Sequence, residues 1–224
     1  MTPPRLEVLP DHEAAARRGA ELLATAARDA VAERGSASLA GSGGTDPWKM
    51  FEAWSEMDVP WESTELFQVD ERVAPAGDEQ RNLTHLLLAL PVERHGLIRP
   101  MPVTDDDLDA AAARYEQSLP EVLDCVHLGI GPDGHTASLV PDDPVLDVAD
   151  RRVAVTGGTY QGVRRMTMTY PQLNASRLLF WLVTGEEKRD PLAKLLAGDH
   201  SIPAGRVNAA DMLVIADEAA AAGL

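Results

Sequence analysis

Cys125-Val126-His127-Leu128-Gly129-Ile130 is an almost unbroken apolar run, and it passes directly into the turn Gly131-Pro132-Asp133-Gly134-His135. A short apolar run that ends in turn residues is typical of a strand buried on both faces of a parallel sheet. Similar runs recur along the chain and alternate with segments whose apolar residues have helical spacing. The expected strands cover residues 38–40, 66–69, 125–130, 153–155, 166–169, 178–183 and 212–215.

Helical segments lie between these strands. The expected helices cover residues 12–34 with Asp11 as cap, 47–57, 81–90, 105–119 with Thr104 as cap, 186–196, and a short alanine-rich stretch after residue 215. Strands that alternate with helices form βαβ units. The sequence therefore predicts an α/β fold, a three-layer, Rossmann-like, doubly wound and mostly parallel sheet with helices on both faces. It has no internal repeat and no long linker, so residues 1–224 are expected to form a single domain.

The composition restricts the function. The chain has 224 residues, with 20 Lys and Arg against 36 Asp and Glu, and a formal net charge of −16. Nonspecific binding to nucleic acid or to an anionic membrane needs cationic surface, so neither partner is expected. No apolar run approaches the roughly 20 residues that span a bilayer, and the N-terminus lacks the apolar segment of a secretory signal. Cys125 is the single cysteine, so we expect no disulfide, no cysteine-based zinc site and a cytoplasmic location.

The charge is unevenly distributed along the chain. Residues 101–150 hold twelve acidic residues and one basic residue, whereas residues 151–200 hold eight basic and four acidic residues. The simpler interpretation is a solvated acidic face. The other is a small cationic pocket on an acidic body.

Ligands of open α/β sheets bind beyond the carboxyl ends of the strands, so the loops that follow strands are candidate site segments. The first such loop is Gly41-Ser42-Gly43-Gly44-Thr45-Asp46-Pro47. Its glycines can turn backbone N–H groups into one concavity, and Ser42 and Thr45 add hydroxyl groups ahead of a helix N-terminus. This pattern favours a phosphate-binding loop. The alternative is a flexible turn with Asp46 as the N-cap and Pro47 as the first helical residue.

Two further loops place a basic residue after a strand. In Asp70-Glu71-Arg72, the forked guanidinium of Arg72 suits a phosphate or an oxyanion, and Asp70 could hold it in place. An ordinary surface ion pair is the alternative.

In Thr184-Gly185-Glu186-Glu187-Lys188, the lysine lies in the first helical turn, where a cation is unfavourable unless an anion binds nearby. The alternative there is a surface pair between Lys188 and Glu186 or Glu187. Arg164 and Arg165 could supply further positive charge.

The glycine-rich turn after residues 125–130 carries the best candidate for acid–base chemistry. His135 on such a turn can be exposed at the edge of the sheet, with a side chain suited to general base catalysis near neutral pH. Asp133 lies two residues away and could orient the imidazole. His127, by contrast, lies within the expected strand and is interpreted as a packed core residue.

Together these segments resemble the 6-phosphogluconolactonases, in the superfamily that they share with the glucosamine-6-phosphate deaminases. The segments that carry the resemblance occur in the family's order, from about residue 39 to 216, and the run Gly131–Ser138 is the most specific. They are Ser42–Pro47, Asp70–Arg72, Asn82, Gly129–Pro141, Arg165–Thr167 and Thr184–Lys188.

The resemblance implies hydrolysis of 6-phosphoglucono-δ-lactone to 6-phosphogluconate, the second step of the oxidative pentose phosphate pathway, without a metal or an organic cofactor. His135 matches the position of the general base, with Asp133 beside it. Arg72 and Lys188 match positions that bind phosphate or stabilise the charge on the carbonyl oxygen. The phosphate-side positions match Ser42, Gly43, Gly44 and Thr45, with Asp70 and Arg165 in support. The implied partner is a small sugar-phosphate lactone, and the protein is expected to be a monomer or a homodimer.

The sequence departs from the family's pattern at two points. The family's glycine loop commonly has threonine where this chain has Asp46, and the segment before Arg164 lacks the prolines often found there.

Two other functions are possible on the same fold. The deaminases carry a glutamate for proton handling at the position of Val140, and valine cannot carry a proton, so hydrolysis fits better than deamination. A non-catalytic sugar-phosphate sensor on the same fold would keep the loop and Lys188 but would not need His135.

Overall fold

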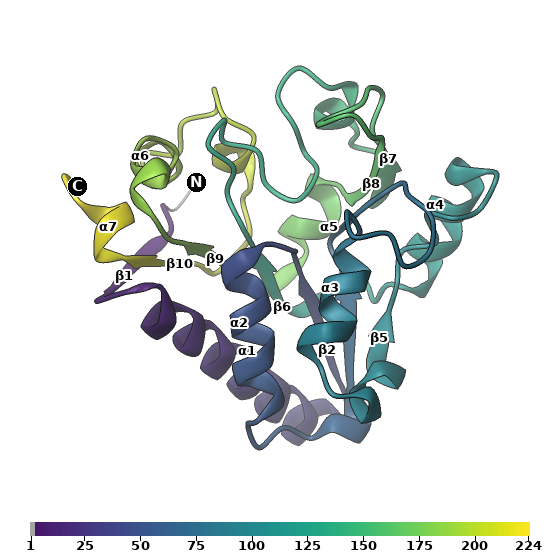
Figure 1. Ribbon diagram of the computed structural model, residues 1–224, viewed down its shortest axis with the longest axis horizontal. Coiled ribbons are helices and arrows are strands. Elements are labelled where there is room, and N and C mark those ends of the chain that lie inside the picture. The colour runs from purple at the N-terminus through teal and green to yellow at the C-terminus, as the bar shows by residue number, and fades with distance from the viewer. Residues whose placement is uncertain (1–2) are drawn as a thin grey trace.

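The computed structural model describes residues 3–224. Its main sheet is parallel throughout and runs in the order β1-β10-β9-β6-β2-β3-β5 (Figure 1). In chain order the strands of this sheet are β1 (Arg5–Leu9), β2 (Ala37–Gly41), β3 (Thr64–Gln68), β5 (Ile98–Arg99), β6 (Leu123–Leu128), β9 (Ser176–Val183) and β10 (Met212–Asp217). The strands expected at residues 38–40, 66–69, 125–130, 178–183 and 212–215 are therefore present.

The direction of winding reverses between β2 and β6, which lie side by side with Gly41 opposite His127. From β2 the chain proceeds outward through β3 to β5, and from β6 it proceeds the other way through β9 to β10. This is the doubly wound order predicted from the sequence. Loops after β2 and β6 therefore meet at the switch point, where open α/β sheets bind ligands.

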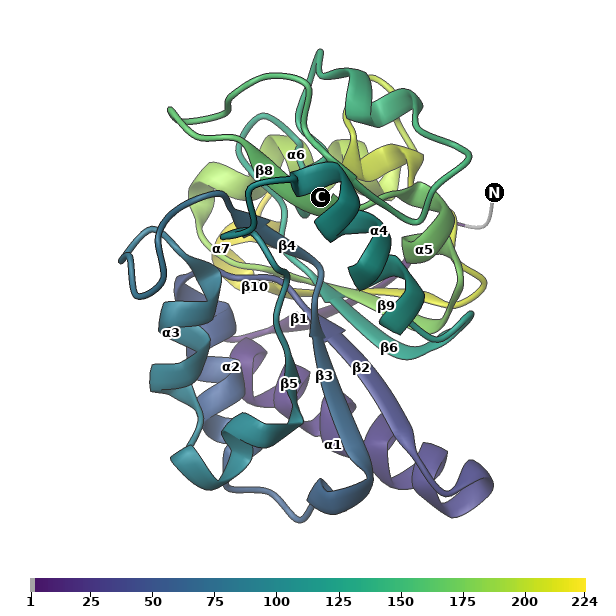
Figure 2. The same ribbon diagram turned by 90° about the vertical axis from the view of Figure 1, so that its right-hand side faces the viewer.

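Helices cover both faces of the main sheet, as predicted (Figure 2). One face packs on α1 (His12–Arg34), α2 (Thr45–Ser55) and α3 (Asn82–Ala89), whose buried side chains share a core with Phe180 and Ile215. The other face packs on α4 (Leu108–Ser118), α5 (Tyr170–Asn174), α6 (Arg189–Leu196) and α7 (Glu218–Ala221), around Leu128 and Trp181. Short 3₁₀ turns cover Trp61–Ser63, Val92–Leu97, Pro144–Asp147, Glu186–Lys188 and Ala204–Arg206.

A second, antiparallel sheet was not expected. It consists of β4 (Asp70–Arg72), β8 (Arg165–Met168) and β7 (Val153–Val155), in the order β4-β8-β7. Residues 153–155 and 166–169 do form strands, but they do not join the parallel sheet, and residues 70–72 are a strand of their own. Because Arg72 lies opposite Arg165 in this register, the small sheet brings together two arginines that are far apart in the sequence.

Several element boundaries differ from the sequence prediction. The helix expected from residue 105 begins at Leu108, because Asp107 rather than Thr104 caps it by accepting from the backbone N–H of Ala110 at 2.9 Å. The helix expected over 186–196 begins as a 3₁₀ turn. The edge strands β1 and β5 were missed. Within residues 3–224, none of the helices has the length and apolar character needed to cross a membrane.

Candidate active site

A pocket of about 350 Å³ lies at the carboxyl ends of the central strands. The four loops singled out in the sequence all contribute to it, so the structure brings together segments that are separated by more than a hundred residues. The predicted site residues in its lining are Ser42, Gly43, Gly44, Thr45, Asp70, Arg72, His135, Arg165 and Lys188. Asp133 lies directly behind His135.

The glycine loop approaches its neighbours so closely that side chains are excluded. A Cβ on Gly43 would lie 2.0 Å from Oδ1 of Asn82, and Gly44 has a φ of +139° that L-residues rarely adopt. Gly44 is the N-cap of α2 and offers no side-chain cap, so the first backbone N–H groups of this 11-residue helix are not capped by a side chain. The buried Ser42 Oγ beside them has no hydrogen-bond partner. The loop therefore presents donors suited to an anion.

Asp46 is not the helix N-cap, which corrects one of the two sequence interpretations. It lies in the first turn of α2, where its carboxylate accepts a hydrogen bond from Thr184 Oγ1 and lies 3.6 Å from His12 Nδ1. The carboxylate thus links the glycine loop to the loop that bears Lys188. A role in fastening these two loops explains how an acidic side chain can occupy a loop with anion-binding geometry.

His135 is held by Asp133, as the sequence suggested. Its Nδ1 lies 2.6 Å from Oδ1 of Asp133, and its backbone N–H donates to the same oxygen at 3.2 Å. Because an ionised carboxylate only accepts, this contact places the proton of the neutral imidazole on Nδ1 and leaves Nε2 as the basic nitrogen. Burial works against the ionised carboxylate, but the hydrogen bonds from His135 and Tyr160 hold the pKa of Asp133 below its ordinary value.

Gly131 provides the space for this pair. A Cβ at that position would lie 2.0 Å from Nδ1 of His135 and 2.7 Å from Oδ1 of Asp133. Gly134 has a φ of +82°, which allows the turn to reverse before His135. The glycine pattern around His135 therefore has a direct steric reason.

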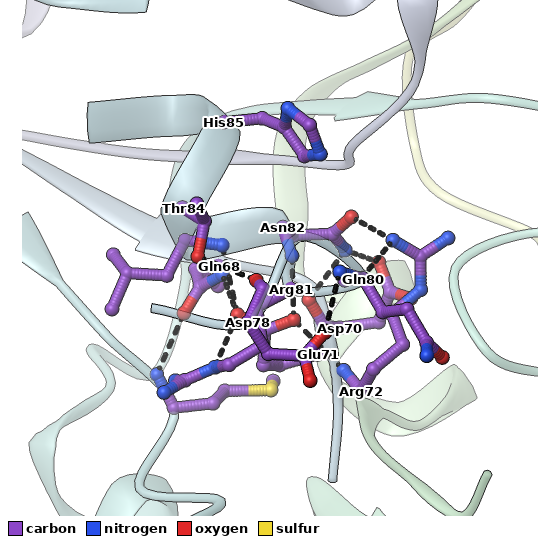
Figure 3. A network of polar contacts seen from close by, with 12 residues as sticks. Gln68, Asp70, Glu71, Arg72, Asp78, Gln80, Arg81, Asn82, Thr84 and His85 are labelled. Atoms are coloured by element: carbon purple, nitrogen blue, oxygen red, sulfur yellow. Dashed lines mark hydrogen bonds and ion pairs between the residues drawn. The ribbon is translucent and has the colours of Figure 1, made fainter. Parts of the chain in front are cut away.

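Arg72 is fixed by Asn82 and by the following loop rather than by Asp70 (Figure 3). Its Nη1 donates to Oδ1 of Asn82 at 2.6 Å and to the carbonyl of Gln80 at 3.0 Å. Asp70 instead accepts from Ser138 Oγ at 2.7 Å and from the Asn82 amide. The expected Asp70–Arg72 pair is therefore wrong: the two side chains share one face of β4, but the carboxylate of Asp70 bonds Ser138 and Asn82, while Arg72 bonds Asn82 and Gln80.

Glu71 is a fully buried carboxylate that organises this region (Figure 3). It accepts from the backbone N–H groups of Arg72, Asn82 and Leu83 at 2.7–2.8 Å, and from Nε2 of Gln68 at 3.0 Å. These bonds fasten β4 to the start of α3 and so position Asn82 against Arg72. Sequence reasoning did not single out Glu71, because nothing local distinguishes it from a surface acid.

Arg165, not Arg164, faces the pocket. Its side chain is almost fully buried, donates to Oε1 of Gln161 at 3.0 Å, and lies with its guanidinium 4.9 Å from the centre of the Tyr160 ring. Burial lowers the pKa of Arg165 below its ordinary value. Arg164 donates to the carbonyl of Thr156 outside the lining.

Lys188 lines the pocket. Neighbouring Glu186 pairs with Arg189 at 3.2 Å rather than with Lys188.

The pocket lining has as many acidic as basic side chains. It contains three basic side chains, Arg72, Arg165 and Lys188, and three carboxylates, Asp46, Asp70 and Glu187. Two of those carboxylates already accept hydrogen bonds from hydroxyl groups, whereas Nε of each arginine is buried without a partner. The two buried guanidinium nitrogens therefore remain available as donors to a bound anion. Among residues 3–224, no cluster of three or more potential metal ligands is found.

The profile of the family described as "Glucosamine-6-phosphate isomerases/6-phosphogluconolactonase" matches residues 10–215. The chain belongs to this family. A 6-phosphogluconolactonase of Nostoc sp. is 35% identical over 208 residues, which cover 86% of this chain and 85% of that protein. A 6-phosphogluconolactonase of Streptomyces coelicolor is 34% identical over 247 residues, covering 99% and 95%.

Solved structures agree with the fold. The 6-phosphogluconolactonase from Thermotoga maritima superimposes with a TM-score of 0.84 at 26% identity, covering 96% of this chain and 99% of that one. A monomeric glucosamine-6-phosphate deaminase superimposes with a TM-score of 0.82 at 19% identity, covering 97% and 98%. Because hydrolases and a deaminase share this fold, the fold alone does not separate the two activities.

Proposed function

We propose that the protein hydrolyses 6-phosphoglucono-δ-lactone to 6-phosphogluconate, with His135 as the general base. The observation that carries the proposal is the His135–Asp133 pair at the edge of a pocket lined by three basic side chains. The names of the relatives support the same substrate. Buried Val140 stands where the deaminases have a proton-carrying glutamate, which favours hydrolysis.

The geometry supports a simple mechanism. Nε2 of His135 takes a proton from water as the water oxygen attacks the lactone carbonyl carbon. The carbonyl oxygen becomes an oxyanion, which the guanidinium groups of the pocket stabilise. When the oxyanion collapses, the bond between the carbonyl carbon and the ring oxygen breaks, and the imidazolium returns its proton to that ring oxygen. Asp133 stabilises the imidazolium between these steps.

The pocket must also anchor the phosphate of the substrate. We assign this role to the uncapped start of α2, the hydroxyls of Ser42 and Thr45, and Lys188, while Arg72 and Arg165 complete the positive side of the pocket. A phosphate dianion at a helix N-terminus satisfies backbone N–H groups that have no partner within the helix. Asp70 supports the pocket through Ser138 and Asn82.

The activity is tested by offering the wild-type protein three ligands. We expect release of acid from 6-phosphoglucono-δ-lactone above the spontaneous rate, and no release of ammonia from glucosamine 6-phosphate. Ammonia release would show deaminase chemistry instead. Binding of 6-phosphogluconate without turnover of the lactone would identify a sensor.

Phosphate anchoring has a separate test. Lys188→Ala is expected to reduce kcat/KM about 10- to 100-fold for the phosphorylated lactone, as expected for a charge-assisted contact, and much less for unphosphorylated gluconolactone. Lys194→Ala is the matched control, because Lys194 pairs with Asp190 on the surface at 2.8 Å and does not line the pocket. Equal losses on both lactones would contradict an anchoring role for Lys188.

A further inference from the structure

Tyr160 occupies the tip of the hairpin between β7 and β8, directly beside His135. Its backbone N–H donates to the carbonyl of Val163 at 3.0 Å, and Gln161 and Gly162 have φ values of +54° and +87°. Two consecutive residues with positive φ form the type of tight turn that matches the twist of a hairpin. The turn fixes the point at which the Tyr160 side chain leaves the backbone.

The base of this hairpin is fastened as well. Asp143 accepts from the backbone N–H groups of Gly157 and Gly158 at 3.0 and 2.9 Å, and Thr156 Oγ1 donates to the carbonyl of Gly158. These bonds hold the start of the segment that leads to Tyr160. The tyrosine is therefore presented by an ordered turn.

The side chain of Tyr160 contacts both members of the His135–Asp133 pair. Its hydroxyl donates to Oδ2 of Asp133 at 2.9 Å and lies 3.3 Å from Nδ1 of His135. The two aromatic rings meet edge to face, with centroids 5.1 Å apart. The guanidinium of Arg165 also lies over the Tyr160 ring, 4.9 Å from its centre.

We propose that Tyr160 is a positioning residue for the base: by occupying the second oxygen of Asp133, it fixes the carboxylate so that the first oxygen holds His135 with the proton on Nδ1. The proposal rests on the proposed function for its effect on catalysis. Neither the glycine pattern nor the family resemblance pointed to Tyr160, which lies in the segment where this chain lacks the family's prolines.

The physical reason lies in how the carboxylate distributes its charge. Each Asp133 oxygen has a donor, so the carboxylate has little freedom to rotate away from the imidazole. The phenol also draws negative charge toward Oδ2, which weakens the attraction of Asp133 for a protonated His135.

Other charges reach His135 from the remaining walls of the pocket. They belong to Asp46, Asp70, Arg72, Arg165, Glu187 and Lys188. None of these side chains is altered when the Tyr160 hydroxyl is removed, so a change in the His135 tautomer of that variant reports on the Asp133–His135 pair.

The test is Tyr160→Phe, which removes the hydroxyl and keeps the ring beside Arg165. We expect kcat to fall about 10- to 100-fold, as for loss of a hydrogen bond to a charged group, with KM changed less than twofold. Tyr115→Phe is the control, because its hydroxyl bonds the backbone carbonyls of Gln68 and Arg99 away from His135, and it should lower Tm without changing kcat.

A second readout does not depend on turnover. In protein labelled with ¹⁵N-histidine, long-range ¹H–¹⁵N NMR should show the proton of neutral His135 on Nδ1 in the wild type and a mixture of tautomers in Tyr160→Phe. Unchanged kcat and an unchanged tautomer in the variant would overturn the proposal, as would a loss of Tm alone. If the wild type does not hydrolyse the lactone, the proposed function fails, while the NMR result still decides the role of Tyr160.

Discussion

Replacing Asp133 with asparagine tests how the base is held. Three donors converge on the carboxylate: the His135 backbone N–H at 3.2 Å, its Nδ1 at 2.6 Å, and the Tyr160 hydroxyl at 2.9 Å. An amide keeps the shape but loses the charge that stabilises the imidazolium. It also brings one N–H₂ group to a position now occupied by an acceptor.

The size of the effect follows from these contacts. A hydrogen bond to a charged group contributes about 1.5–3 kcal/mol, and about 1.4 kcal/mol corresponds to a factor of ten. We therefore expect Asp133→Asn to lower kcat about 10- to 100-fold. KM should change little, because Asp133 lies behind His135 and is not part of the pocket lining.

The assay is lactone hydrolysis followed by acid release in a pH-stat, with the spontaneous rate subtracted at each substrate concentration. Asp107→Asn is the matched control, because Asp107 caps α4 and asparagine is an equally good N-cap. It should leave both kcat and Tm unchanged. A folded Asp133→Asn protein with wild-type kcat would refute the reasoning, since it would show that the carboxylate neither orients nor stabilises the base.

Three other predictions concern sterics and pH. Gly131→Ala should abolish most activity because its Cβ would lie 2.0 Å from His135 Nδ1, whereas Gly129→Ala, whose Cβ meets nothing within 4 Å, should retain most of it in the same lactone assay. Burial lowers the pKa of His127 from 6.5 to about 3, so the native state resists protonation and loses stability from pH 6.5 downward. His127→Leu should therefore gain Tm over the wild type as pH falls from 7 to 5, and a constant difference would contradict this. Burial alone would raise the pKa of Asp143, but the backbone N–H donors hold that pKa below 3.8; Asp143→Ala should therefore lower Tm at pH 7, by a margin that begins to shrink only when the pH falls below 3.8.

The parallel sheet and the location of the site could be predicted from sequence because both depend on local patterns. Residues 125–130 and 178–183 are almost wholly apolar, as expected for strands buried on two faces. Loops that follow strands carry glycines where the structure requires close approach, at Gly43 after residues 37–41 and at Gly131 after residues 125–130. The rule that parallel sheets bind ligands at their carboxyl ends then placed four distant loops in one pocket.

The antiparallel sheet could not be predicted in the same way. Residues 70–72 are polar and short, and their strand conformation comes from pairing with residues 165–167. Such pairing leaves no periodic signal in either segment. The same reason explains why Tyr160 was missed and why no role could be given to Asn82, because Tyr160 acts on Asp133 and Asn82 acts on Arg72 only through contacts that the fold creates.

The central claim is that His135 is the base, and His135→Asn tests it most directly. Asparagine retains a polar side chain of similar reach but cannot accept and return a proton at neutral pH. The account predicts that hydrolysis of 6-phosphoglucono-δ-lactone falls at least about 100-fold, in the range expected for loss of a general base, while 6-phosphogluconate still binds. Hydrolysis at the wild-type rate, after the spontaneous reaction is subtracted, would contradict it.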